Sequence, residues 1–172
     1  MSEQKGEIRI YVACLAAYNN GQLHGRWIDA CQEEAAIRDD IKAMLKASPI
    51  PNAEEFAIHG YEGFEGASVE EYSSIHNVVA LAQFISDNGA LGGKLLGYYG
   101  NLDDAENAFN DHYYGELKSV AEFAQELTEQ TTEIPSSLEF YIDYDRMARD
   151  LEINDILSIE TGFEEVHIFW QH

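Results

Sequence analysis

Lysine and arginine are scarce in this chain and almost absent from its middle. No Lys or Arg occurs between Lys46 and Lys94, and from residue 95 to 145 a single lysine interrupts twelve carboxylates. Residues 1–46 have a net charge of −1, whereas residues 47–172 have a net charge of −21. With 10 basic against 32 acidic side chains, the chain offers no basic face to neutralise phosphates. We therefore expect no direct binding to nucleic acid.

Cysteine and long apolar runs are rare as well. Cys14 and Cys31 are the only cysteines and lack C-x-x-C spacing, so a disulfide framework or a zinc site has no support. We expect both to be reduced and Cys14 to be buried. The chain does not start with a charged segment followed by an apolar one, and no apolar run approaches the roughly 18 residues that span a bilayer. We therefore expect a cytoplasmic protein without membrane contact.

Signatures of metal sites and catalysis are missing too. Two acidic segments, beginning at Asn101 and Asp143, superficially resemble calcium loops, but neither has the required glycine at position six or glutamate at position twelve. A catalytic carboxylate pair cannot be selected from 32 candidates. The sequence therefore predicts no catalytic residue, no metal and no cofactor. The histidines lack H-x-H and H-E-x-x-H spacing and are expected on the surface or in packing: His24, His59, His76, His112, His167 and His172.

The chain nevertheless contains enough apolar material to fold. It is 45% hydrophobic and 12% aromatic, which argues against a disordered acidic tail. Adaptation of a whole proteome to salt would deplete basic residues evenly, yet residues 1–46 retain theirs. A folded protein with so much self-repulsion indicates a strongly basic partner.

Hydrophobic periodicity predicts an α+β fold with mixed ends around a helical middle. Residues 7–14 alternate like a half-buried strand, and apolar residues within 33–45 recur at helical spacing. Further extended segments are expected at 25–28, 56–59, 138–142 and 166–170, and further helices at 75–85, 91–99, 103–111 and 119–130.

Three glycines mark the clearest internal boundary. Gly60, Gly63 and Gly66 lead toward Ser68 and Glu71, which have the spacing of a capping box at the start of the helical part. A length of 172 residues suits one domain or two to three small subdomains. We expect an elongated chain of three: 1–62 (α+β), 63–100 (helical) and 101–172 (α+β).

The predicted helix at 119–130 places carboxylates on a stripe beside its apolar face. At about 1.5 Å rise per residue, side chains four apart lie about 6 Å apart along the axis, comparable to successive DNA phosphates. Like charges at that spacing cost roughly 0.2–0.5 kcal/mol per pair. A merely solvated face would mix both signs, so this pattern favours a decoy that presents carboxylates in place of phosphates. The stripe consists of Glu122, Glu126 and Glu129.

Long segments of the chain resemble the ArdA antirestriction proteins, and the similarity covers nearly all of it. It is carried by IYVACLAAYNNGQLHGRW at 10–27, EEFAIHGYE at 54–62 and IPSSLEFYIDYDRMARDL at 134–151. The resemblance implies a DNA mimic encoded on mobile elements. Such a protein is a curved cytoplasmic homodimer that occupies the DNA-binding groove of Type I restriction-modification enzymes and blocks both their activities.

The resemblance also implies roles for particular residues. The antirestriction motif of the family corresponds to about residues 119–133, a segment associated with the dimer contact. Val120, Phe123 and Leu127 are therefore expected at that contact as well as in the local core. The candidates for phosphate mimicry are Asp103, Asp104, Glu106, Asp111, Glu116, Glu122, Glu126 and Glu129.

Two other classes of function stay open at this point. An acidic adaptor would sequester basic DNA-binding proteins in general, with little preference for a Type I enzyme. An acidic hydrolase would have an acid pH optimum and would be abolished by one substitution. The family resemblance favours the non-enzymatic inhibitor.

Overall fold

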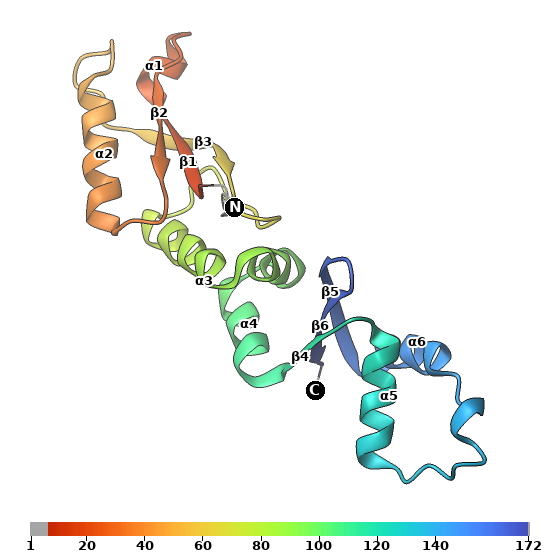
Figure 1. The fold of residues 1–172 in the computed structure, drawn as a ribbon. Coiled ribbons are helices and arrows are strands. Elements are labelled where there is room, and N and C mark those ends of the chain that lie inside the picture. The colour runs from red at the N-terminus through yellow and green to blue at the C-terminus, as the bar shows by residue number, and fades with distance from the viewer. Residues whose placement is uncertain (1–6, 172) are drawn as a thin grey trace, which may run out of the picture. The chain divides into compact units, whose positions relative to one another are not determined.

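The computed structural model describes residues 7–171, and His172 lies outside the described part. The chain forms two compact units, Met1–Leu102 and Asp103–His172, called here the N-terminal and C-terminal units (Figure 1). Each has one three-stranded antiparallel sheet with helices around it. The predicted α+β class is confirmed, whereas the finer division at residues 62 and 100 stays a prediction.

The sheet of the N-terminal unit has the order β2-β1-β3. It consists of β1 (Arg9–Cys14), β2 (Gly25–Asp29) and β3 (Phe56–Glu62). Ile10 and Val12 in the central strand are fully buried, while Tyr11 between them is half-buried. The alternation expected for this strand is confirmed, and Cys14 is buried as predicted.

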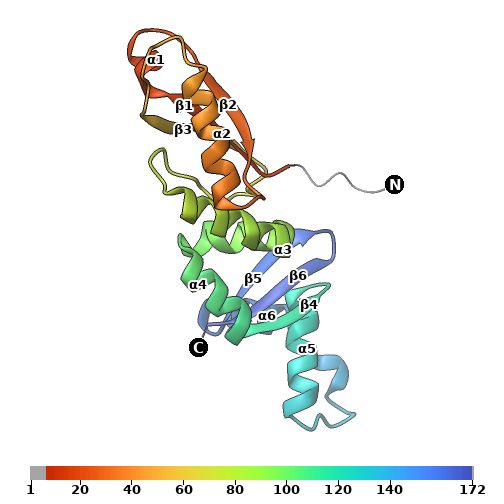
Figure 2. The same cartoon turned by 90° about the vertical axis from the view of Figure 1, so that its left-hand side faces the viewer.

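One face of this sheet is covered by α2 (Glu34–Lys46), as Figure 2 shows. Ile37, Ile41 and Met44 form its buried stripe at helical spacing. The short helix α1 (Leu15–Asn19) follows directly after β1.

The helical part of the unit is α3 (Ile75–Tyr99), which is kinked at Gly89 with φ 59° and ψ −142°. Its N-terminus is capped by Ser74, whose side chain accepts a 3.1 Å hydrogen bond from the Asn77 amide. The predicted capping box at Ser68 and Glu71 is therefore wrong. Residues 71–72 instead form a turn before the helix, and the Glu71 carbonyl accepts a 2.9 Å bond from the Ile58 amide of β3.

A close backbone approach fixes the link between β3 and α3. A Cβ atom at Gly93 would lie 2.5 Å from the Glu65 carbonyl oxygen, so only glycine fits at this point. The link that follows β3 thus packs directly on the second half of α3.

The C-terminal unit has the sheet order β4-β6-β5. Its strands are β4 (Tyr113–Leu117), β5 (Ile156–Gly162) and β6 (Glu165–Trp170). Its helical segments are α4 (Leu102–Asn107), the π-turn η1 (Ala108–His112), α5 (Val120–Thr131), the 3₁₀ turn η2 (Glu139–Tyr141) and α6 (Tyr144–Asn154).

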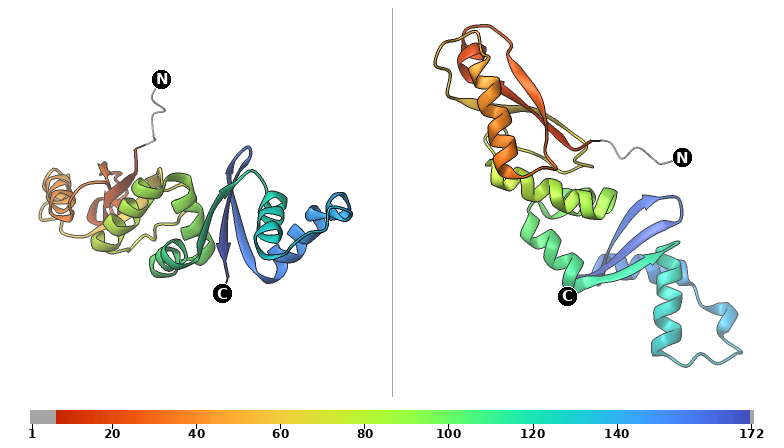
Figure 3. Two further views of the ribbon diagram at one scale, coloured as in Figure 1. Left: turned by 60° about the horizontal axis from the view of Figure 1, so that its bottom comes forward. Right: turned by 60° about the vertical axis from the view of Figure 1, so that its left-hand side comes forward.

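Both faces of the C-terminal sheet are packed. The helices α5 and α6 lie on one face (Figure 3). There, Phe123 of α5 and Leu151 of α6 pack against Ile156 and Ile168. Phe169, the next residue along β6, points to the other face and contacts Phe109 of η1 with ring centroids 6.2 Å apart. The sheet therefore forms the middle layer of the unit.

The segment 138–142, predicted to be extended, is instead the η2 turn. Its chain reverses because the Leu138 amide donates to the Pro135 carbonyl and the Tyr141 amide donates to the Leu138 carbonyl. The prediction of a strand at 166–170 is confirmed by β6.

Candidate functional site

The acidic residues singled out from the sequence lie on four successive elements of the C-terminal unit. Seven of their eight side chains are exposed, and Glu126 is half-buried. Asp103, Asp104 and Glu106 are on α4, Asp111 is on η1, Glu116 is on β4, and Glu122, Glu126 and Glu129 are on α5.

The carboxylates of α5 also have local structural partners. Ser119 caps the helix by accepting a bond from the Glu122 amide, while Glu122 Oε2 accepts a 2.9 Å bond from the Lys118 amide. This is a reciprocal capping arrangement of the kind that stabilises helix starts. Glu129 Oε1 accepts a 3.0 Å bond from Gln125 Nε2. These side chains are therefore held in place without being neutralised.

Glu126 is the most firmly positioned of the set. Tyr114 Oη donates a 2.7 Å hydrogen bond to Glu126 Oε2. The hydrogen bond to the carboxylate raises the pKa of the Tyr114 phenol, because the bond favours its protonated form. Since Tyr114 also packs on Phe123, this contact ties the acidic stripe to the core.

Basic side chains are rare in the C-terminal unit. Residues 103–172 contain eighteen acidic and three basic side chains, a net charge of −15. Among the described residues, ion pairs with arginine are formed by Glu34 and Glu62, both in the N-terminal unit. Within the described part of the chain, Glu122, Glu126 and Glu129 form no ion pair with a basic side chain. The carboxylates of α5 therefore keep their negative charge at the surface of the C-terminal unit.

The apolar side of α5 builds the core of its own unit. Phe123 is fully buried with Ile156 and Ile168, and its ring centroid lies 5.6 Å from that of Trp170. Val120 and Leu127 are half-buried and pack against the same cluster. Of the three expected dimer residues, only Val120 and Leu127 retain accessible surface.

Sequence reasoning missed a group of exposed apolar side chains around η2. Leu138, Phe140 and Tyr141 are 53%, 92% and 83% exposed. The alternation of Leu138, Phe140 and Ile142 favoured a strand, and the adjacent Tyr141, which breaks that alternation, was the one signal against it. Ile153 of α6 and Phe163 in the β5–β6 turn are also highly exposed.

A polar cluster lies on the face of the C-terminal sheet that is opposite to α5 and α6. Tyr113 Oη and His167 Nδ1 are hydrogen-bonded at 2.7 Å, and Thr161 Oγ1 is 3.1 Å from His167 Nε2. Burial lowers the pKa of His167, and the nearby carboxylates of Glu116 and Glu165 partly oppose this. Both ring nitrogens of His167 are thus hydrogen-bonded to side chains of the C-terminal unit.

The described residues contain no cluster of three or more His, Cys, Asp or Glu side chains arranged to hold a metal ion. Over the same range, no helix combines the length and the apolarity that crossing a membrane would require.

The fold and the charge together define an acidic α+β protein whose C-terminal unit has a net charge of −15. The family model described as antirestriction protein (ArdA) matches residues 10–165. The chain therefore belongs to the ArdA family of antirestriction proteins. A comparison with curated proteins found none that matches the chain.

Proposed function

We propose that this antirestriction protein imitates the phosphates of duplex DNA and occupies the DNA-binding groove of a Type I restriction-modification enzyme. The observation that carries this proposal is the set of exposed carboxylates on α4, η1, β4 and α5, in a unit with a net charge of −15. A groove built to neutralise phosphates attracts such a surface by the same electrostatic force that it exerts on DNA. The protein then acts as a competitive, non-catalytic decoy in the cytoplasm, binding neither nucleic acid nor membrane.

The proposed mechanism depends on several carboxylates that are held at fixed positions, more than on any single contact with the enzyme. On α5, local hydrogen bonds from Lys118, Tyr114 and Gln125 hold Glu122, Glu126 and Glu129 at their positions on the helix. Pre-positioned carboxylates lose less side-chain entropy when the enzyme binds them. Electrostatic attraction over many charges also accelerates association, as it does for other strongly complementary pairs.

The direct test is competition between the protein and cognate duplex DNA for a purified Type I methyltransferase core. We expect the protein to displace the DNA, with an inhibitory concentration that rises steeply between roughly 50 and 200 mM salt. Enzyme that keeps its DNA at every protein concentration would contradict the proposal. Equal displacement of DNA from unrelated basic proteins would favour the acidic adaptor instead.

We further propose that the protein acts as a homodimer held together by the C-terminal unit. Val120 and Leu127 offer the accessible edge of α5, and Phe123 supports them from the core. The exposed side chains of Phe140 and Tyr141 add an apolar surface of the kind that marks protein contacts.

Replacing Phe140 and Tyr141 together by serine should weaken the dimer, because their apolar area would no longer be removed from water on association. Sedimentation velocity at several protein concentrations measures the effect. The matched control is Phe163→Ser, which removes an equally exposed aromatic ring at a different site. A double variant that dimerises like the parent protein would exclude η2 from the interface.

A further inference from the structure

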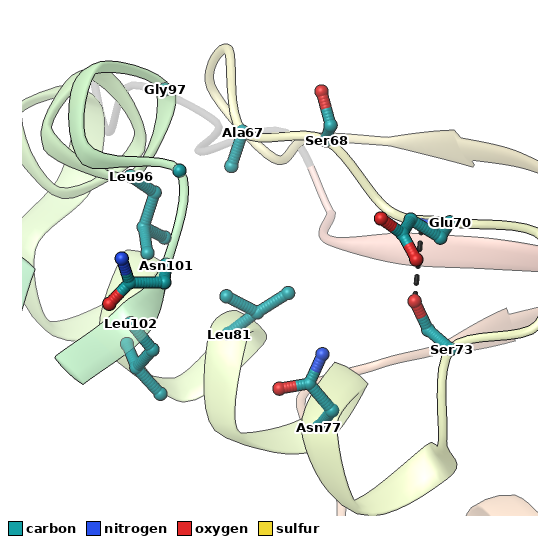
Figure 4. A pocket seen from close by; sticks show the side chains of 11 residues that line it. Ala67, Ser68, Glu70, Ser73, Asn77, Leu81, Leu96, Gly97, Asn101 and Leu102 are labelled. Atoms are coloured by element: carbon teal, nitrogen blue, oxygen red, sulfur yellow. Dashed lines mark hydrogen bonds between the residues drawn. The ribbon is translucent and has the colours of Figure 1, made fainter.

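A pocket of about 280 Å³ opens beside α3 in the N-terminal unit (Figure 4). Its apolar part is formed by the buried side chains of Ala67, Leu81 and Leu96. Glu70 and Ser73 lie at the end away from Leu96 in Figure 4. The site therefore has an apolar floor and an acidic end.

The volume restricts what can bind there. Pockets for drug-sized ligands measure roughly 300–1,000 Å³, and this one lies just below that range. It is open to the surface, with Glu70 and Asn77 exposed at its rim. One long side chain of a protein partner fits such a site better than a whole metabolite does.

The Glu70 carboxylate at the pocket has no ion-pair partner among residues 7–171. No lysine or arginine occurs between residues 46 and 94, the stretch that contains Glu70. Within the described part of the chain, the Glu70 carboxylate forms no ion pair. Its backbone is fixed nevertheless, since the Glu70 amide donates a 3.1 Å bond to Ser73 Oγ and its carbonyl accepts one from the Ser73 amide. The backbone that carries Glu70 is thus fixed at the pocket, while its carboxylate remains available for a cation from outside.

We propose that this pocket receives one long basic side chain, lysine or arginine, from the protein that the chain inhibits. The methylene groups of such a side chain pack on Leu81 and Leu96, while its cationic end meets the Glu70 carboxylate and the Asn77 carboxamide oxygen. The net charge of −22 already demands a basic partner, so the occupant has the complementary charge. The inference rests on the proposed function and adds a fixed contact in the N-terminal unit to the distributed charges of the C-terminal unit.

The first test is Glu70→Gln in the DNA competition assay with the methyltransferase core. We expect the inhibitory concentration to rise about tenfold, because the cationic end of the bound side chain would meet this one carboxylate. The matched control is Glu54→Gln, which removes the same charge from an exposed carboxylate in the loop before β3 and should change the value less than about twofold. Equal effects of the two substitutions would overturn the pocket proposal.

A second variant fills the site from within. Asn77→Arg places a guanidinium beside Glu70, and the cap of α3 is preserved because it uses the Asn77 amide and not its side chain. The control is Gln83→Arg, which adds the same charge to the exposed face of the same helix. We expect Asn77→Arg to weaken inhibition about tenfold and Gln83→Arg to weaken it much less. Inhibition by Asn77→Arg that matches the Gln83→Arg control would contradict the proposal.

The two proposals fail in different ways in these experiments. If the unsubstituted protein never displaces DNA, the proposed function fails and the pocket proposal falls with it. If the unsubstituted protein displaces DNA but Glu70→Gln and Asn77→Arg behave like their controls, only the pocket proposal fails. Circular dichroism of every variant verifies that the substitutions leave the fold intact.

Discussion

Phe123 links the acidic surface of α5 to the interior of the C-terminal unit. Its ring is fully buried, 4.8 Å from the Tyr114 ring by centroid, and Tyr114 in turn holds the Glu126 carboxylate. One side chain thus supports both the packing of the sheet and the position of a surface charge.

Phe123→Ala should lower the free energy of unfolding by about 3–5 kcal/mol, since it removes a buried ring and leaves a cavity among Tyr114, Ile156 and Trp170. Urea denaturation followed by circular dichroism measures the loss. Glu129→Ala, on the exposed face of the same helix, should change it by less than about 0.5 kcal/mol. Similar losses in both variants would refute the central role of the ring.

His167 should make the stability depend on pH. Burial keeps the pKa of this imidazole below its ordinary 6.5, so the unfolded chain binds the proton more readily than the folded one. The contribution of His167 to the free energy of unfolding is present above the pKa that it has in the unfolded chain. This contribution is lost as the pH falls through the lower pKa that it has in the folded protein.

Unfolding free energies at about pH 7.5 and about pH 5 give the test, compared between the parent protein and His167→Gln. The parent protein should lose more stability on acidification than the variant, because glutamine does not titrate. An identical loss in both proteins would mean that His167 does not contribute.

At the scale of elements, strict periodicity made the N-terminal unit predictable. The alternation that ends at Cys14 and the helical spacing up to Leu45 reproduce β1 and α2 closely. The break predicted at residues 87–89 coincides with the kink of α3 at Gly89. In β1 and α2 most of the buried side chains repeat with the period of the element.

The C-terminal unit was harder to predict because its elements carry weaker patterns. α6 has a single buried residue, Ala148, so it lacks the broad apolar stripe of a typical surface helix. The register of β4 shifts between Tyr113 and Gly115, which interrupts the alternation of that strand. The acidic residue types were evident from the sequence, but their local partners, such as Tyr114 for Glu126, depend on tertiary contacts.

The kink of α3 depends on its glycine. Gly89 has φ 59° and ψ −142°, a conformation that other residues rarely adopt, and a Cβ atom there would meet nothing within 4 Å. Gly89→Ala should therefore cost about 1–3 kcal/mol through backbone conformation alone. Chemical denaturation measures the cost, and Gln83→Ala in the same helix is the control. A neutral Gly89→Ala substitution would mean that the helix can straighten freely.

At the scale of the whole molecule, the proposed inhibition depends on the summed charge and not on one carboxylate of the C-terminal unit. Replacing Asp103, Glu116 or Glu129 singly by the matching amide should leave the inhibitory concentration almost unchanged, because each removes one charge of many. Combining the three should weaken inhibition progressively and make it less sensitive to salt. The competition assay with the methyltransferase core measures both effects, and a tenfold loss from any single one of them would contradict the distributed-charge model.

The two tryptophans of the chain are divided between the two units. Trp27 lies on the N-terminal sheet with the Arg9 guanidinium 4.7 Å from its ring centroid, and Trp170 packs on Phe123 in the C-terminal unit. Each unit consequently carries its own fluorescent reporter. With Trp27→Phe the tryptophan emission comes only from the C-terminal unit, and with Trp170→Phe it comes only from the N-terminal unit. The order in which the units unfold, and which of them senses a bound enzyme, can thus be read from the emission of two single-tryptophan proteins.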